Sequence, residues 1–312
     1  MIKIGIVGAG IIALSHANAI MKSNRCQLTA VSDIVLDRAK ELAKPHGANY
    51  YSDYKQMCED EQLDAVILNL PHFLHCDVSI YFLERGIHVL VEKPMANTSQ
   101  ECSMMIDAAN RNNARLAVGH LQRFFGANQR VKEIIDQEIY GKLCMMTEVR
   151  NIFYFEENRP KWFLDKKAAG GGIVMNYFAH TLDKWIYLLD SDITQINSLC
   201  RNLLDGFNVE GNAQIFLKFK NEISANVTYC GYRTPPFYET AYYFSHGAIK
   251  VTDSIRLFVS ETNEFKEVAL PETNDAFELQ LKEFLNYIQN QNTRIATAEY
   301  GQMIVLAIEK AY

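Results

Sequence analysis

The fold of this chain is decided near its start by residues 2–13, which read IKIGIVGAGIIA. A short β-rich run leads into Gly8 and Gly10, and an apolar helical pattern follows them. This is the G-x-G-x-x-A spacing of a nucleotide-binding turn between a strand and a helix. Gly8 permits the tight turn, and Gly10 lets the backbone approach a pyrophosphate at the N-terminus of the helix. We therefore expect Gly8, Gly10, Ile11 and Ile12 to bind a dinucleotide.

The acidic residue that should accompany such a turn is Asp33, at the end of the second predicted strand. It follows Gly10 by 23 residues, near the spacing of about 20 for an acid that binds the ribose hydroxyls. A carboxylate there repels a 2′-phosphate, so NAD is favoured as the cofactor and NADP is the alternative. Arg38 is the only nearby cation that could weaken this repulsion. The other reading of the whole pattern is a structural turn with a surface acid.

The first 120 residues alternate between strand and helix patterns. The predicted strands cover residues 2–7, 27–32, 65–70, 88–91 and 115–119. The predicted helices cover residues 11–21, 36–43, 75–85 and 99–113, the last with Ser99 as its expected N-cap. The nearly continuous apolar run AVILNL at 65–70 suits a strand that is buried on both faces. This alternation predicts a doubly wound parallel sheet of the Rossmann type.

The pattern changes after residue 120. Helical patterns cover residues 124–139, 170–190, 277–289 and 298–312, and strand patterns cover 145–155 and four to six runs between 193 and 270. Serial strands without intervening helices indicate an antiparallel or mixed sheet. We expect an α/β protein with a Rossmann domain over residues 1–120 and a second α/β domain, with a large and mostly antiparallel sheet, over residues 121–312.

The composition excludes several classes of function. The 312 residues are 48% hydrophobic and 22% charged, with a net charge of -6. This balance is ordinary for a globular enzyme and disfavours nucleic acid or an anionic membrane as a partner. The seven cysteines are scattered without a C-x-x-C pair, which favours reduced thiols in the cytoplasm. The chain shows neither a signal-peptide pattern nor an apolar run of about 18 residues, so no spanning helix is expected.

The first catalytic motif is Glu92-Lys93-Pro94, directly after the predicted strand HVLV. Ligands bind at the carboxyl ends of strands in open α/β sheets. Pro94 biases Lys93 toward an extended conformation, which would hold the lysine beside the nicotinamide. The alternative for a lone lysine in this position is a solvated surface charge.

The second motif is GGGIVMNYFAHTLD at residues 170–183. The glycines permit unusual backbone angles or the close approach of a ligand. The following helix should place Asn176, His180 and Asp183 on one face, because they stand at i, i+4 and i+7. The alternative for His180 is a satisfied core histidine.

These motifs carry a resemblance to the glucose–fructose oxidoreductase / inositol dehydrogenase / rhizopine-catabolism (Gfo/Idh/MocA) family. It rests on the GAGIIA loop, on LPHFLHCDVSIYFLERGIHVLVEKPMA, on GHLQRF and on GGGIVMNYFAHTLD, which span nearly the whole chain. The resemblance implies a Rossmann domain followed by an α/β domain whose open sheet binds substrate and often mediates homo-oligomers, as dimers or tetramers. It also implies NAD(P)-dependent oxidation or reduction of a sugar, a polyol or a related small molecule.

The resemblance also implies roles for single residues. Lys93 and His180 would be the proton-transfer residues, with His180 orienting the substrate or sharing the proton, and Asn176 would complete the catalytic set. The family usually has Asp at position 176 and Gly where this chain has Phe178. Asn176 lacks the negative charge, which should lower the pKa of Lys93 and His180 because their cationic forms lose a partner. We therefore expect a lower pH optimum for alcohol oxidation than an Asp version would have.

Further positions follow from the same match. The expected cofactor-binding set is completed by Asn69, Pro71, His72, His75, Glu92 and Lys93. His72 and His75 form H-x-x-H, but neither a carboxylate nor a cysteine completes a metal site at a helical spacing, so no metal is expected.

The expected substrate-binding set is Arg123, Tyr154, Trp162, Asn176 and His180. Arg123 would suit a carboxylate or a phosphate, or would form an interdomain ion pair. The two large aromatics would wall the pocket or lie in the core. Three functions stay open: a dehydrogenase or reductase, an NAD-dependent enzyme that cleaves glycosides, and a catalytically silent dinucleotide-binding sensor or regulator.

Overall fold

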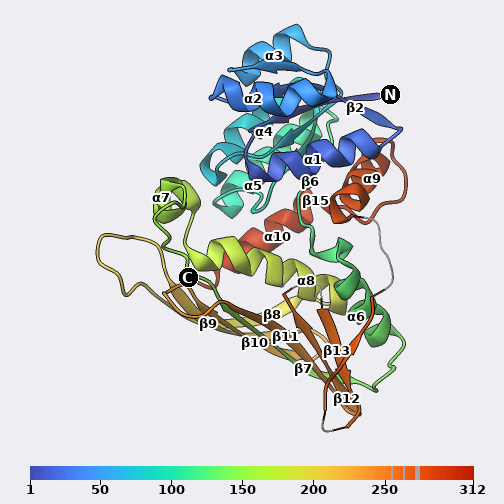
Figure 1. The fold of residues 1–312 in the computed structure, drawn as a ribbon, viewed down its shortest axis with the longest axis vertical. Helices are drawn as coiled ribbons and strands as arrows, with labels where there is room; N and C mark the ends of the chain where they lie inside the picture. The colour runs from blue at the N-terminus through green and yellow to red at the C-terminus, as the bar shows by residue number, and fades with distance from the viewer. Residues whose placement is uncertain (254–255, 263, 271–274) are drawn as a thin grey trace. The chain divides into compact units, whose positions relative to one another are not determined.

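The computed structural model describes residues 1–253, 256–262, 264–270 and 275–312. The chain forms two compact units (Figure 1). They are Met1–Leu121 with Asn274–Val305, and Gln122–Thr273 with Leu306–Tyr312. The segment Asn274–Val305 therefore differs from the expected division, which assigned every residue after 120 to the second domain. The reason is that Ala296–Thr297 of this segment pairs with Leu116–Val118, and its helix Ala276–Ile288 contacts the helix Ile11–Lys22.

The first unit is built on a seven-stranded sheet in the order β15-β6-β5-β4-β1-β2-β3. All neighbours are parallel except β15, which pairs antiparallel with β6 at the edge. The strands are β1 (Ile2–Val7), β2 (Cys26–Ser32), β3 (Asn49–Tyr51), β4 (Ala65–Leu68), β5 (His88–Val91), β6 (Leu116–Val118) and β15 (Ala296–Thr297). This is a doubly wound Rossmann order, and the doubly wound parallel sheet that the sequence predicted is confirmed.

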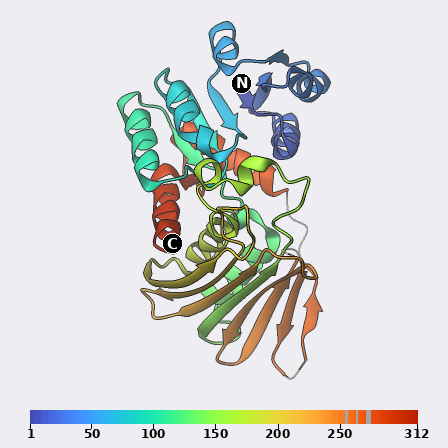
Figure 2. The ribbon, with the colours of Figure 1, turned by 90° about the vertical axis from the view of Figure 1, so that its left-hand side faces the viewer.

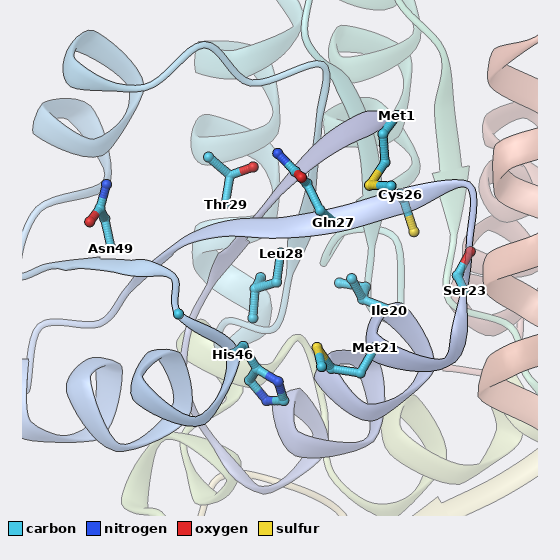
Figure 3. A pocket seen from close by; sticks show the side chains of 11 residues that line it. Met1, Ile20, Met21, Ser23, Cys26, Gln27, Leu28, Thr29, His46 and Asn49 are labelled. Atoms are coloured by element: carbon cyan, nitrogen blue, oxygen red, sulfur yellow. The ribbon is translucent and has the colours of Figure 1, made fainter.

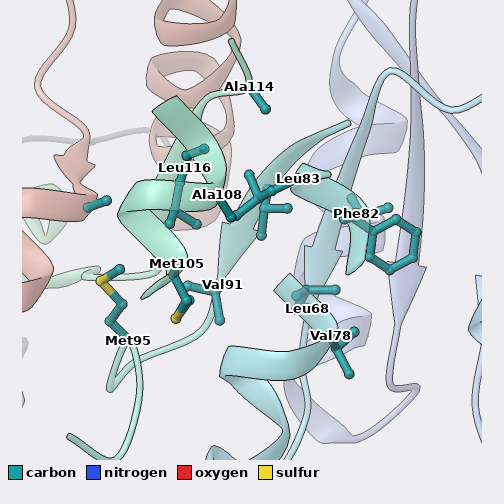
Figure 4. Packing of buried hydrophobic residues seen from close by; sticks show 14 of the residues in the cluster. Leu68, Val78, Phe82, Leu83, Val91, Met95, Met105, Ala108, Ala114 and Leu116 are labelled. Atoms are coloured by element: carbon teal, nitrogen blue, oxygen red, sulfur yellow. The ribbon is translucent and has the colours of Figure 1, made fainter. Parts of the chain in front are cut away.

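Helices cover both faces of this sheet, with α4 and α5 on one face and α1 on the other (Figure 2). The helices of this unit are α1 (Ile11–Lys22), α2 (Leu36–Ala43), α3 (Tyr54–Asp60), α4 (His75–Leu83), α5 (Ser99–Arg111) and α9 (Ala276–Ile288), with short 3₁₀ turns η1 (Lys44–His46) and η2 (His72–Leu74). Helix α10 (Ala298–Glu309) begins in this unit and ends in the second. Phe82, Met105 and Leu116 belong to the apolar core between the strands and helices α4 and α5 (Figure 4).

Local details of the first unit differ from the sequence prediction. The N-cap of α5 is Thr98 rather than Ser99, because Thr98 and Glu101 form a reciprocal capping box. The short elements β3 and α3 were not predicted, since a three-residue strand leaves too little pattern to detect.

The second unit is built on an eight-stranded sheet in the order β14-β13-β12-β11-β7-β10-β9-β8. Its neighbours are antiparallel except β7 and β10, which are parallel. The strands are β7 (Leu143–Asn151), β8 (Ile193–Arg201), β9 (Asn212–Phe219), β10 (Ser224–Cys230), β11 (Phe237–Phe244), β12 (Gly247–Thr252), β13 (Arg256–Ser260) and β14 (Lys266–Val268). The predicted α/β fold class with a mostly antiparallel second sheet is confirmed.

The described residues contain seven strands between 193 and 270, where four to six were expected. Residues 254, 255 and 263 of that predicted strand region lie outside the described residues. Burial alternates along β9 and β10, so one face of the sheet is covered and the other is open.

Helices α6 and α8 lie along the covered face (Figures 1 and 2). The helices of this unit are α6 (Gly126–Asp136), α7 (Lys166–Ala169) and α8 (Ala179–Leu189), with 3₁₀ turns η3 (Gln122–Phe124) and η4 (Lys161–Leu164) and a π-helical turn η5 (Val174–Phe178). In the part of the chain that the structure describes, none of the helices has the length and apolar character needed to cross a membrane.

Candidate functional site

The predicted dinucleotide-binding segments meet at the carboxyl edge of the first sheet. The loops after β1 and β4 continue the hydrogen-bond ladder beyond the strand ends. The Gly8 N–H donates to the Ser32 carbonyl at 2.8 Å, and the Asn69 N–H donates to the Val7 carbonyl at 2.8 Å. The loops are thereby held in register at the edge where ligands of this fold bind.

The glycine loop has the geometry that its spacing predicted. Gly8 has a φ of +90°, and a Cβ on it would lie 2.4 Å from the Asn69 carbonyl oxygen, so only glycine fits. Gly10 is the N-cap of α1 and has no side-chain cap. Among the described residues, no heavy atom outside its immediate chain neighbours lies within 4 Å of a Cβ built on Gly10. Open space thus faces the N-terminal N–H groups of α1, as a pyrophosphate requires.

Asp33 ties this loop to the end of β2. Its Oδ2 accepts from the Ala9 N–H at 2.8 Å, and its Oδ1 accepts from the Val35 N–H at 2.8 Å. Each carboxylate oxygen has a second lone pair, and the residue is partly exposed. Asp33 can therefore accept hydrogen bonds from ribose hydroxyls without releasing the loop.

Two further observations fit a dinucleotide at this edge. The side-chain oxygen and nitrogen of Asn69 are both buried and have no hydrogen-bond partner within the described residues. Buried amides without partners are uncommon, so a ligand is a natural partner. Ile11 and Ile34 are 98% and 93% exposed beside Gly10 and Asp33. The residues of this edge therefore fit the cofactor that the glycine spacing implies.

The two histidines of the H-x-x-H pair are both buried. His75 at the start of α4 is 0% exposed, and its two ring nitrogens lie 2.8 Å from the Pro94 and Leu70 carbonyl oxygens. Burial lowers the pKa of His75, and the two carbonyls do not fully offset this effect. His75 thus braces the loops after β4 and β5, which differs from the direct cofactor contact predicted for it. His72 is 5% exposed in η2, the turn that follows Pro71.

Lys93 is partly exposed directly after β5, and its peptide bond to Pro94 is cis. The preceding Glu92 is held by His16 of α1, whose Nε2 lies 3.0 Å from Glu92 Oε1. The Lys93 N–H donates to Glu92 Oε2 at 3.1 Å. Burial raises the pKa of Glu92, but the His16 hydrogen bond and the nearby charges outweigh it, so the pKa is lowered. His16, which the sequence prediction missed, therefore anchors an ionised Glu92 beside Lys93.

The glycine run of the second unit serves a contact that the sequence did not reveal. A Cβ on Gly172 would lie 2.2 Å from the Glu210 carbonyl oxygen. The buried Glu210 carboxylate accepts from the N–H groups of Gly172 and Val174, each at 2.8 Å. It also accepts from the Tyr312 hydroxyl at 2.8 Å. Glu210 thus satisfies the N-terminal N–H groups of the helix that carries the predicted catalytic residues.

That helix does not begin as a regular α-helix. Asn176, which is 8% exposed, lies in the π-helical turn η5, and His180 is the second residue of α8. The wider turn alters the simple i, i+4 alignment expected for these two side chains. Single π-turns are frequent at functional sites, although the sequence gives no signal for them.

The other predicted substrate residues have different surroundings. Arg123 forms a buried ion pair with Asp183 of α8, with Nη2 and Oδ1 2.5 Å apart, inside the second unit rather than between domains. Tyr154 is 0% exposed and packs edge-on against Phe155 and Tyr177, so it lies in the core. Trp162 in η4 stacks on Phe163 and is partly exposed.

A separate pocket in the first unit lies at the amino ends of β1 and β2 (Figure 3). It is lined by Met1, Met21, Cys26, Thr29 and His46 among others. This is the opposite edge from Gly8 and Asp33, and none of the predicted site residues reaches it. Within the residues that are described, no group of three or more His, Cys, Asp and Glu side chains could hold a metal ion.

Comparison with known proteins agrees with this geometry. A curated dehydrogenase of Comamonas testosteroni, 1-carboxy-3-chloro-3,4-dihydroxycyclohexa-1,5-diene dehydrogenase, is 31% identical over 231 residues, which are 74% of this chain and 58% of that protein. Glucose-6-phosphate 3-dehydrogenase of Bacillus subtilis is 29% identical over 73% of this chain and 67% of its own length. The chain thus spans about half to two thirds of the curated relatives that it matches.

A solved structure shares the fold over the whole chain. The aldose-aldose oxidoreductase of Caulobacter crescentus, solved with glycerol, superposes with a TM-score of 0.89 at 19% identity and covers 100% of this chain and 96% of its own. Two family models match in sequence. The GFO/IDH/MocA model, an oxidoreductase family with an NAD-binding Rossmann fold, matches residues 2–120, and the GFO/IDH/MocA C-terminal domain matches residues 128–250. The chain therefore belongs to the GFO/IDH/MocA oxidoreductase family.

Proposed function

We propose that this chain is an NAD(P)-dependent oxidoreductase that acts on a hydroxyl or carbonyl group of a sugar, a polyol or a related small molecule. The observation that carries the proposal is Lys93, placed after β5 at the same sheet edge as the glycine loop and Asp33. An amine at the carboxyl end of a strand can exchange a proton with a substrate beside a dinucleotide. The relatives named above are dehydrogenases, which supports the same chemistry.

We assign the residues of the two units as follows. Gly8, Gly10, Ile11 and Ile12 would hold the pyrophosphate end of the cofactor, and Asp33 the ribose. When bound, the nicotinamide accepts or supplies a hydride. Asp33 favours NAD, because its carboxylate repels a 2′-phosphate, while NADP stays the alternative.

The protons are handled by this chain's own side chains. Lys93 would take the proton from the reacting hydroxyl during oxidation and return it during reduction. His180 would orient the substrate or share that proton, with Asn176 as its neighbour along the helix. Trp162 and Arg123 are proposed to face the substrate, Arg123 with its charge already balanced by Asp183.

The test is the appearance of NADH absorbance with NAD or NADP and a panel of sugars, polyols and sugar derivatives. Net reduction of the nucleotide by one class of hydroxy compound supports the proposal. Release of nitrophenol from nitrophenyl glycosides without net NADH would instead indicate glycoside cleavage. Cofactor binding without either activity would indicate a silent sensor.

The residue at position 176 should set the pH dependence of this activity. In Asn176→Asp, the added carboxylate stabilises the cationic forms of nearby bases and raises their pKa. Because oxidation needs the unprotonated base, the acidic limb of the kcat/KM profile should move to higher pH by about one unit. The matched control is Asn110→Asp on the exposed end of α5. An acidic limb that stays in place or moves to lower pH contradicts the assignment.

We also propose that the open face of the second sheet joins copies of this chain in a homodimer or homotetramer. Met145, Leu199, Phe237 and Tyr243 are large apolar residues in its strands that are each more than a third exposed. A cytoplasmic location is supported by the seven cysteines, all of which are free thiols.

A further inference from the structure

The covered face of the second sheet holds a cation with unusual surroundings. Arg150 near the end of β7 has its guanidinium carbon over two aromatic rings, 4.7 Å from the centre of Tyr177 and 4.1 Å from the centre of Tyr238. Tyr177 comes from η5, the turn that carries Asn176, and Tyr238 comes from β11. Both tyrosine rings therefore lie within cation–π distance of the guanidinium.

Two buried cations of this unit, Lys184 and Arg123, already have anionic partners. Lys184 of α8 forms an ion pair with Glu148, two residues before Arg150 on β7. Lys184 Nζ also donates to the Thr240 hydroxyl at 2.7 Å and to the Tyr238 hydroxyl at 3.0 Å. Arg123 is paired with Asp183. Each of these ion pairs uses one carboxylate, so neither carboxylate is left to form an ion pair with Arg150.

Arg150 itself forms neither an ion pair nor a hydrogen bond with any described residue. Its Nε is buried without a partner, while the side chain as a whole is partly exposed. Burial lowers the pKa of Arg150, but Glu148 and the surrounding tyrosines outweigh it and raise the pKa, so the group stays charged. Glu148 is the ion-pair partner of Lys184, so the Arg150 guanidinium has no anionic partner of its own among the described residues.

A partly buried guanidinium without an anionic partner is costly unless a ligand supplies the missing anion. We propose that Arg150 binds a carboxylate or a phosphate group of the substrate, so that the natural substrate is an acidic or phosphorylated sugar-like hydroxy compound. This inference rests on the proposed function for the reaction itself. A guanidinium edge binds either anion through two parallel hydrogen bonds, which an ammonium cannot reproduce.

The kinetic test compares matched substrates in the holoenzyme with NAD. D-Glucose is set against D-glucuronate and D-glucose 6-phosphate, which separates carboxylate from phosphate. Wild type should prefer one of the anionic compounds. Arg150→Met should lower kcat/KM for that compound roughly 10- to 100-fold, the range for hydrogen bonds to a charged group, and change it little for D-glucose. Arg150→Lys should recover only part of the loss. The control is Arg130→Met, which removes a partly exposed cation of α6 that is paired with Glu133.

A binding measurement separates this inference from the reaction. Calorimetric titration of the NAD-loaded protein with inorganic phosphate and with D-glucuronate should show binding that Arg150→Met abolishes and Arg130→Met keeps, with both variants melting near wild type. If no compound is turned over but this binding is seen, the proposed reaction fails and the anion site stands. If wild type binds neither anion, or if Arg150→Met and Arg150→Lys bind them as tightly as wild type, the inference is overturned.

Discussion

Lys93→Met is expected to lower kcat by roughly 10²- to 10⁴-fold, the contribution typical of a general acid or base. Methionine keeps most of the length of the side chain and removes the amine that would exchange the proton. The affinity for NAD, measured by titration of protein fluorescence, should change little, because the glycine loop and Asp33 are untouched. The fold should also persist, since Lys93 lies partly exposed at the end of β5.

Two further variants sharpen this test. Lys93→Arg keeps a positive charge that cannot be given up near neutral pH, so it should be about as inactive as the methionine variant. Lys44→Met removes an exposed lysine of the same unit and should leave kcat unchanged. A Lys93→Met enzyme that retains kcat within tenfold of wild type would remove Lys93 from the proton transfer.

Lys184→Met should cost about 3–5 kcal/mol of unfolding free energy, because it leaves Glu148 charged and buried without its partner. Both side chains are about 2% exposed between α8 and the second sheet. Urea unfolding followed by circular dichroism measures the loss. The double variant Lys184→Met with Glu148→Leu should regain most of it, since the uncompensated charge is gone. Lys132→Met, which breaks surface pairs with Asp136 and Asp190, should cost about 1 kcal/mol or less.

The same pair gives a pH dependence with a definite sign. Burial raises the pKa of Glu148, but the Lys184 and Arg150 charges outweigh it, so the pKa in the folded state lies below the usual value. Its contribution to stability is therefore present above the unfolded pKa and is lost as the pH falls through the folded pKa. The difference in stability between wild type and the double variant should shrink on acidification. If the single and double variants lose the same unfolding free energy at neutral pH, the loss does not come from an uncompensated charge on Glu148.

Most of the first unit could be predicted from the sequence because its signals are local. The strand, glycine turn and helix of residues 2–22 follow from neighbouring residues, and parallel order follows from the alternation that comes after. Asp33, Lys93 and the glycines were predicted in this way, because each stands within three residues of the end of a strand. The apolar run at residues 65–70 ends in the structure at Leu68, where the chain turns toward the ligand edge.

The parts that could not be predicted depend on contacts between distant residues. Glu210 accepts a hydrogen bond from Gly172, which is 38 residues away in sequence, and Arg123 pairs with Asp183, which is 60 residues away. Nothing local marks either carboxylate as buried. The π-helical turn at Asn176 is likewise invisible to a pattern that assumes 3.6 residues per turn. His75 was assigned to the cofactor because of its motif, whereas its two carbonyl neighbours come from separate loops.

The return of Asn274–Val305 to the first unit has a consequence for building chimeric enzymes. The backbone passes between the units after Leu121, Thr273 and Val305, so the second unit is largely an insertion into the first unit rather than a module appended to it. A transplanted second unit therefore needs junctions at both ends of the insertion. A fragment cut after residue 121 would lack β15 and α9, leaving the β6 edge unpaired and prone to self-association.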